Sequence, residues 1–190
     1  EATADLHMGL LIAVARRMLE GDRAVRAGLF PGGQSSYLEG ASVFGKTIGL
    51  IGGGGRIGRA VARRAHGFSM EVLYWGPRRK SAEDETVWDM QFVPLDELLA
   101  RSDFVSVHAP LNEGTRHLVG ERELALMKPT AFIVNTARGA IVDEAALVKA
   151  LQEYKNGDRS HPSMRAIAAS LSDKDMADLA AYYGQSGLSA

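Results

Sequence analysis

The chain has 190 residues, no cysteine, and a net charge of −1 from 22 basic and 23 acidic side chains. The lack of cysteine excludes disulfides, thiolate metal sites and thioether-linked haem, and it favours a reducing compartment, the cytoplasm. The balanced charge argues against a nucleic-acid partner. No apolar stretch approaches the roughly 20 residues that span a bilayer, so we expect no membrane partner either.

Residues 3–27 are predicted to form one helix, followed by a loop over residues 31–45. Gly28 and Pro31 are typical of residues that end a helix. Apolar side chains recur in the helix at the i, i+3, i+4, i+7 spacing of one buried face. These residues are Leu11, Val14, Ala15 and Met18.

From residue 47 onward, short apolar strands alternate with helices. Strands are predicted at 47–51, 71–75, 104–109 and 131–136, and helices at 56–66, 95–100 and 143–151. Pro94 marks the start of the second of these helices, and Asp143 is the expected N-cap of the third. Such alternation predicts an α/β fold with a doubly wound parallel sheet and right-handed crossovers.

The stretch "TIGLIGGGGRIGRAVARRA", residues 47–65, places four consecutive glycines between a strand and a helix. Gly53, Gly55 and Gly58 satisfy the G-x-G-x-x-G pattern of a Rossmann-type dinucleotide site. The helix that begins near Arg56 and Ile57 would offer its free N–H groups to the pyrophosphate. A structural glycine-rich turn is the alternative interpretation, and the register leaves open whether Gly52 or Gly53 is the first motif glycine.

The second predicted strand ends in "EVLYWGPRRK", where no acidic residue follows Tyr74 and Trp75. An NAD site usually has an acid at this place for the ribose 2′-hydroxyl. Arg78 and Arg79 follow instead, and arginine pairs well with a phosphate. The segment therefore favours NADP(H) over NAD(H); a solvated basic turn is the alternative.

Residues 1 to about 151 resemble the D-isomer-specific 2-hydroxyacid dehydrogenases, in particular the glyoxylate/hydroxypyruvate reductase branch. The resemblance rests on "KTIGLIGGGGRIG", "SDFVSVHAPLNEGTRHLV" and "LMKPTAFIVNTARGAIVDEAALVKAL", with "EATADLHMGLLIAVARRMLEGDRAVRAG" matching the helix that leads into the nucleotide-binding domain. It implies an NAD(P)-dependent oxidoreductase that moves a hydride between the nicotinamide and a small 2-keto or 2-hydroxy acid. A homodimer is compatible with it.

The resemblance also implies roles for individual residues. Arg138 matches the arginine that holds the substrate carboxylate and carbonyl oxygen, and a guanidinium suits two oxygens in one plane. From the residue alone, an arginine that caps the sheet edge or pairs with Asp143 is the alternative. Residues that match the cofactor-lining segments are His108, Pro110, Thr115, Thr136 and Ala137. Taken by itself, His108 is interpreted as a structural histidine rather than an acid–base group.

Two features of the family pattern have no match in this sequence. The family's glutamate and histidine lie in segments resembling "GLDVFEEEP" and "PHIGSAT", and its separate substrate domain precedes the nucleotide-binding domain. The resemblance therefore implies a truncated sheet, with 131–136 as an edge strand. The alternative function is a catalytically incomplete dinucleotide-binding fragment, with at most trace glyoxylate reductase activity.

Residues 152–190 are predicted to form a polar loop and a short helical tail, with a helix over residues 172–183. The segment "YKNGDRSHPSMRAIAASLSDKDMADLAAYY" resembles the C-terminal part of a class I c-type cytochrome, in which Met164 matches the haem-ligating methionine. Because the C-x-x-C-H motif is absent, we expect no haem, and Met164 is interpreted as a packing residue. An electron-transfer fusion is the weakest of the functional interpretations for the same reason.

Overall fold

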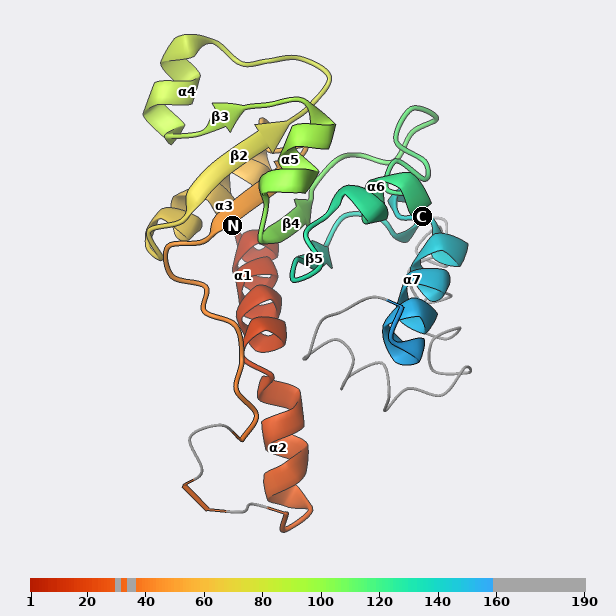
Figure 1. The fold of residues 1–190 in the computed structure, drawn as a ribbon. Helices are drawn as coiled ribbons and strands as arrows, with labels where there is room; N and C mark the ends of the chain where they lie inside the picture. Colours follow the sequence, from red (N-terminus) through yellow and green to blue (C-terminus); the bar gives the residue numbers. More distant parts are fainter. Residues whose placement is uncertain (30–31, 34–36, 159–190) are drawn as a thin grey trace.

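The computed structural model describes residues 1–29, 32–33 and 37–158, and its centre is a five-stranded parallel sheet with strand order β3-β2-β1-β4-β5 (Figure 1). The strands are β1 (Thr47–Ile51), β2 (Glu71–Trp75), β3 (Gln91–Phe92), β4 (Phe104–Val107) and β5 (Phe132–Asn135). The helical elements are α1 (Ala2–Ala15), α2 (Met18–Arg26), α3 (Arg56–His66), α4 (Ala82–Trp88), α5 (Leu95–Arg101), α6 (Glu121–Leu126), the 3-10 turn η1 (Gly139–Ile141) and α7 (Glu144–Asn156). The predicted α/β Rossmann-type fold is confirmed.

The central strand β1 pairs in parallel with both β2 and β4. Its last residue, Ile51, lies opposite Trp75 of β2 and Val107 of β4, so the three strands end at the same level. The residues of β4 are buried throughout. Such strands need helices on both faces of the sheet. Because the strands are parallel and end at the same level, the loops that follow them lie together at one end of the sheet.

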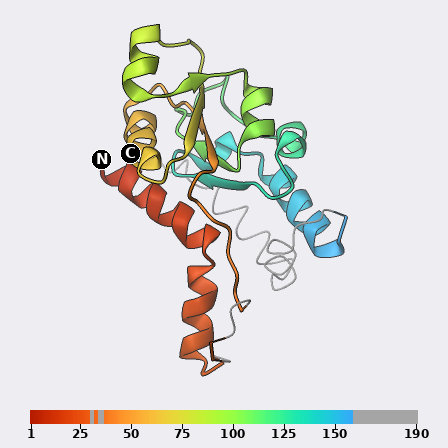
Figure 2. The same ribbon diagram turned by 60° about the vertical axis from the view of Figure 1, so that its left-hand side comes forward.

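Helices cover the two faces of the sheet in separate layers (Figures 1 and 2). On one face, α1 and α3 bury Leu11 and Val61 against Phe104 and Phe132, whose rings stack 5.3 Å apart. On the other face, α5 and α6 cover the sheet with a second apolar cluster that includes Leu98. Within the described part of the chain, every helix is too short or too polar to cross a membrane.

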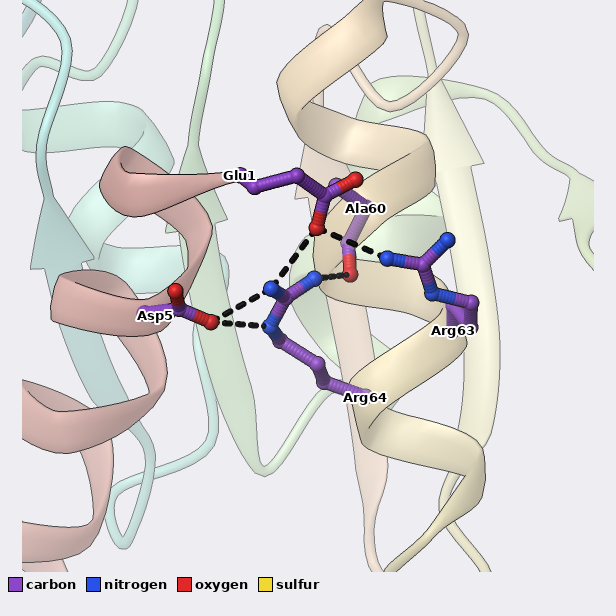
Figure 3. Close-up of polar contacts among 5 residues, drawn as sticks. All are labelled: Glu1, Asp5, Ala60, Arg63 and Arg64. Atoms are coloured by element: carbon purple, nitrogen blue, oxygen red, sulfur yellow. Dashed lines mark hydrogen bonds and ion pairs between the residues drawn. The ribbon is translucent and has the colours of Figure 1, made fainter.

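An ion-pair cluster joins the first turn of α1 to α3 (Figure 3). Arg63 and Arg64 each donate to Glu1 Oε2 at 2.7 Å, and Arg64 also contacts Asp5 and the Ala60 carbonyl. The bonds from Arg64 and Arg63 lower the pKa of the Glu1 carboxyl. Glu1, Asp5 and Arg63 are exposed and Arg64 is half-buried, so these ion pairs add little stability, and buried side chains such as Leu11 hold α1 to the sheet.

The single helix predicted over residues 3–27 is wrong, because the structure has two helices there. Arg17 adopts a left-handed conformation with φ 53°, which ends the run of α1 and starts α2 in a new direction. The Ala15 carbonyl then accepts the N–H of Ala41 at 2.8 Å instead of continuing the helix. In the predicted apolar face, Leu11 and Ala15 are buried, but Val14 and Met18 are 38% and 57% exposed.

The predicted helix over residues 143–151 is present but longer. Asp143 caps α7 by accepting the N–H of Ala146 at 2.9 Å, as predicted. The helix continues to Asn156 and ends where Gly157 adopts φ 90°, so the loop predicted from residue 152 was wrong for residues 152–156. Gln152 and Asn156 are exposed on this part of the helix. The predicted helix over residues 172–183 and the cytochrome-like segment that includes Met164 lie outside the described residues.

Sequence patterns missed four short elements, α4, β3, α6 and η1, and overextended two strands. The strand predicted over residues 104–109 ends at Val107, and the one predicted over 131–136 spans Phe132–Asn135. The predicted edge position of this last strand is observed, because β5 pairs only with β4 among the described residues. The elements that were missed have between two and seven residues, which is too short for a periodic pattern to emerge.

Candidate functional site

The glycine-rich turn lies at the point where the strand order reverses. From β1 the chain builds β2 and β3 on one side and then crosses to β4 and β5 on the other. Ligands of doubly wound sheets bind at the carboxyl ends of the strands at this switch point. The N–H of His108 donates to the Ile51 carbonyl at 2.8 Å there. Gly52 has φ 85°, and a Cβ on it would lie 2.7 Å from the Ala109 nitrogen, so this turn requires glycine.

Gly53 and Gly58 are restricted by close packing rather than by backbone conformation. A Cβ on Gly58 would lie 2.5 Å from both the Cα and the carbonyl oxygen of Gly53. A Cβ on Gly53 would lie 2.6 Å from the Tyr74 Cβ. Helix α3 therefore approaches the turn as closely as two bare backbones allow. Gly52 and Gly53 both need to be glycine, for different reasons.

Gly55 is different, because a Cβ on it would meet only the Gly52 carbonyl oxygen, at 3.3 Å. It is the N-cap of α3, and within the described residues no side chain caps this helix. Arg56 and Ile57 follow at the exposed first turn. The open backbone and the uncapped N–H groups fit a pyrophosphate, which binds helix N-termini and needs close backbone approach.

A hydrogen-bonded network fills the carboxyl end of β2. The Tyr74 hydroxyl donates to Glu85 at 2.8 Å and accepts the N–H of Lys80 at 2.8 Å. Arg79 pairs with Glu85 through two bonds of 2.9 and 2.8 Å, and Arg79 in turn lowers the pKa of that carboxyl. The Lys80 side chain lies over the glycine turn, since a Cβ on Gly54 would be 2.6 Å from its Cε.

Arg138 follows β5 at the same edge of the sheet. Asn135 shapes its turn by donating to the Arg138 carbonyl and accepting the N–H of Ala137, each at 2.9 Å. The exposed Arg138 guanidinium donates to the Ala137 carbonyl at 2.9 Å. The alternative partner considered from sequence, Asp143, lies 3.3 Å from His117 Nδ1 instead.

The predicted cofactor-lining residues after β4 are used partly within their own loop. Pro110 is exposed, and its carbonyl accepts a hydrogen bond from the Thr115 hydroxyl at 2.6 Å. The same hydroxyl accepts the N–H of Asn112 at 2.8 Å. Thr115 therefore holds the loop in shape, and its contact with a cofactor stays a prediction.

A buried chain of polar side chains connects α1 to the ends of β4 and β5. Ser106 Oγ lies 2.7 Å from His7 Nε2 and 2.6 Å from His108 Nε2. His7 Nδ1 lies 3.2 Å from the Thr136 hydroxyl. Burial lowers the pKa of His7 to about 4, and burial together with the nearby His7 lowers that of His108 to about 3. Both rings are therefore neutral at pH 7 and serve as hydrogen-bonding groups.

Sequence reasoning missed His7, Ser106, Lys80 and Glu85. A weak signal existed for His7, because it precedes Leu11 by four residues and so belongs to the buried side of α1. No local signal marks Ser106, which sits in an otherwise apolar strand. The residues that were predicted lie after β1, β2, β4 and β5, so the fold places all of them at one edge of the sheet.

Residues 8–157 match the family described as D-isomer specific 2-hydroxyacid dehydrogenase, NAD binding domain. The chain belongs to this family. A relative named glyoxylate reductase, from Thermococcus gammatolerans, is 51% identical over 156 residues, which cover 80% of this chain and 46% of the relative. The chain thus spans about half the length of the curated relatives it matches.

Solved structures that are similar to this chain have the same fold. A glyoxylate reductase from Paecilomyes thermophila is 38% identical, with a TM-score of 0.72 over 94% of this chain and 59% of that one. An acyclic imino acid reductase, solved with NADPH and D-Arg, is 37% identical, with a TM-score of 0.71 over 80% of this chain and 47% of that one. The NAD-binding role of this domain is therefore a property of its family.

Proposed function

We propose that the chain serves an NAD(P)-dependent oxidoreductase that transfers a hydride between the nicotinamide and a small 2-keto or 2-hydroxy acid, such as glyoxylate or hydroxypyruvate. One observation carries this proposal: the exposed Arg138 follows β5 at the same sheet edge as the glycine turn after β1. A dinucleotide and an acidic substrate could therefore be held side by side. Relatives named glyoxylate reductase support this substrate class.

Each part of the site has a distinct task in this proposal. When bound, the dinucleotide would supply the hydride to the keto carbon, and the alkoxide that forms there would take up its proton from solvent water. Gly53, Gly55 and Gly58 let its pyrophosphate reach the N-terminus of α3. The Arg138 guanidinium forks the carboxylate and keto oxygen of the acid, which orients the keto carbon for transfer. Thr136 and Ala137, together with the loop after β4, would contact the nicotinamide end.

The role of Arg138 predicts a coupling between the keto acid and the cofactor. Glyoxylate should tighten the binding of NADPH to the unmodified chain, because the two ligands form one ternary complex. The Arg138→Gln variant should bind NADPH normally but lose about 10- to 100-fold of its glyoxylate affinity, the range for a bond to a charged group. Calorimetric titration of NADPH with and without glyoxylate measures both effects.

Arg101→Gln is the matched control for this experiment. Arg101 ends α5 and pairs with Glu71 and Glu97, and Glu71 begins β2, so the guanidinium lies at the opposite edge of the sheet. Glyoxylate should therefore tighten the binding of NADPH to the Arg101→Gln variant as much as it does for the unmodified chain. An equal response in Arg138→Gln would refute the assignment of Arg138.

We also propose that NADP(H) is preferred over NAD(H). Basic residues follow β2, and the two arginines differ in their surroundings. Arg79 is already held by Glu85, whereas within residues 37–158 no ion pair involves the exposed Arg78. Lys80 lies over Gly54 and adds a positive charge beside the turn. Arg78 is therefore the better placed of the two arginines to meet a 2′-phosphate.

Replacing Arg78 and Arg79 by alanine is expected to weaken NADPH binding by about 1–3 kcal/mol and to change NADH binding little. Arg79→Ala alone should contribute less, because a phosphate would have to compete with Glu85 for that guanidinium. Titration of both cofactors at one ionic strength measures these differences. Equal affinities of the unmodified chain for NADPH and NADH would contradict the preference.

Finally, we propose a homodimer that is formed through α1 and α2. Helix α2 extends away from the sheet in both views (Figures 1 and 2), and none of its residues is buried. Leu6, Leu10 and Val14 form an exposed row on α1, and Leu19 on α2 is 68% exposed. A row of exposed apolar side chains favours a partner, and the identical row on a second copy can cover it by two-fold symmetry.

Leu19→Asp should therefore convert a dimer into a monomer, because it places a charge inside the apolar contact. Val87→Asp is the control, since Val87 is 70% exposed but lies on α4 at the other side of the molecule (Figure 1). Sedimentation velocity distinguishes the two states. The dimer proposal fails when the unmodified chain sediments as a monomer at the concentration used for both variants.

A further inference from the structure

The buried polar network of His7, Ser106, His108 and Thr136 joins two residues of the candidate cofactor site through a helix that is remote in sequence. Thr136 follows β5, and His108 follows β4, whereas His7 lies on α1, 129 residues before Thr136. His7 and Ser106 are fully buried, each with 0% exposure. The rings of His7 and His108 meet edge to face, with centroids 4.7 Å apart. His108 and Thr136 are thus connected inside the protein.

We propose that His7 is a positioning residue that couples the Thr136 hydroxyl to His108 through Ser106. The hydrogen-bond donor or acceptor that Thr136 offers to a bound nicotinamide dinucleotide then changes together with the one that His108 offers. The proposal rests on the function proposed above. It adds to the cofactor site a buried residue of α1, which lies outside the loops that follow the strands.

The coupling follows from the number of hydrogen-bond donors in the network of Thr136, His7, Ser106 and His108. A neutral imidazole has one N–H donor and one acceptor nitrogen, and a hydroxyl has one donor. If His7 Nδ1 donates to Thr136, its Nε2 must accept from Ser106, and Ser106 Oγ must then accept from His108 Nε2. If Thr136 donates instead, each of the other bonds reverses. The hydrogen bonds of this network can therefore all run in one direction or all in the other. Through His7, the direction of the bond at Thr136 determines the direction of the bond at His108.

His108 and Thr136 are the two ends of the hydrogen-bonded network, and both lie beside the elements that are expected to hold the cofactor. A Cβ on Gly52 would lie 2.9 Å from the His108 carbonyl carbon, so the His108 backbone touches the glycine turn. Thr136 stands between Asn135 and Ala137 in the turn that presents Arg138. A change in the hydrogen bonding of His108 therefore affects the glycine turn, and a change at Thr136 affects the turn that presents Arg138.

A double-mutant cycle on cofactor affinity tests the coupling. His7→Leu and Thr136→Val, which keeps the shape of threonine, should each weaken NADPH binding about tenfold, the upper range for one neutral hydrogen bond. The double variant should bind NADPH no more weakly than the weaker single variant, because either single substitution already interrupts the hydrogen-bonded network. About a hundredfold loss in the double variant would mean independent effects and would overturn the proposal.

Separate measurements remove the trivial explanations. Leu11→Ala perturbs the packing of α1 without touching the polar chain, so it should lower the free energy of unfolding but leave the NADPH affinity within about twofold. If His7→Leu does not fold, Ser106→Ala breaks the same chain by losing one oxygen and takes its place in the cycle. If the unmodified chain binds neither NADPH nor NADH, the proposed function and the coupling both fail. If the unmodified protein binds NADPH but the losses of affinity in the two single variants add up in the double variant, only the coupling is refuted.

Discussion

Replacing Gly58 by alanine is expected to destabilise the folded chain by about 3 kcal/mol or to prevent folding. Glycine to alanine inside a helix normally stabilises by up to about 1 kcal/mol. Here the sign reverses, because the new Cβ would lie 2.5 Å from backbone atoms of Gly53, which cannot move aside as a flexible side chain could. Helix α3 would have to shift away from the sheet. Urea unfolding measures the loss.

Gly55→Ala is the matched control within the same motif. Its Cβ would meet only the Gly52 carbonyl oxygen, and the backbone of Gly55, with φ −81°, is open to any residue. We expect its free energy of unfolding to change by less than about 1 kcal/mol. NADPH affinity should nevertheless fall, because the added methyl group occupies the approach of the pyrophosphate. Equal stability of both variants would show that α3 tolerates a larger separation than the structure indicates.

Acid is expected to destabilise the folded chain well before its carboxyl groups titrate. Each histidine of the unfolded chain takes up a proton near pH 6.5, whereas burial lowers the pKa of His7 to about 4 and of His108 to about 3 in the folded chain. The unfolded state therefore binds more protons below pH 6.5, and the free energy of unfolding falls as the pH falls toward 4. Each histidine contributes about 2 kcal/mol between about pH 7.5 and pH 5.

Urea unfolding at several pH values across this interval measures the slope. His7→Leu should reduce the slope by about half, because one of the two groups no longer titrates. Leu11→Ala should lower the free energy of unfolding at every pH and leave the slope unchanged, since it adds and removes no titrating group. A free energy of unfolding that is flat between about pH 7.5 and pH 5 would mean that the two histidines take up protons over the same pH range in the folded chain as in the unfolded chain.

Patterns that are local in the sequence were sufficient for most of the fold. Strands β1, β2, β4 and β5 were predicted because each is a short apolar stretch between turn residues, and the alternation with helices implied parallel pairing. The glycine turn was predicted because its positions need a bare backbone, and the structure gives steric reasons at Gly52, Gly53 and Gly58. Periodicity and glycine stereochemistry act within a few residues, so they are readable from one sequence.

Contacts between distant segments decided the rest. Helix α1 ends where Arg17 turns left-handed and the Ala15 carbonyl bonds to Ala41, which the apolar spacing of 3–27 does not reveal. Arg79 looked like one of two equivalent arginines until the fold brought it to Glu85.

What the sequence by itself determined was the Rossmann-type order of elements and the glycine turn, because both depend on neighbours along the chain. Only the tertiary structure decided that His7 reaches Ser106, 99 residues away, and Thr136. A polar side chain acquires such partners when burial removes it from water and leaves it to the groups that packing brings within reach. The packing of α1 against β4 and β5 therefore made these residues into one network.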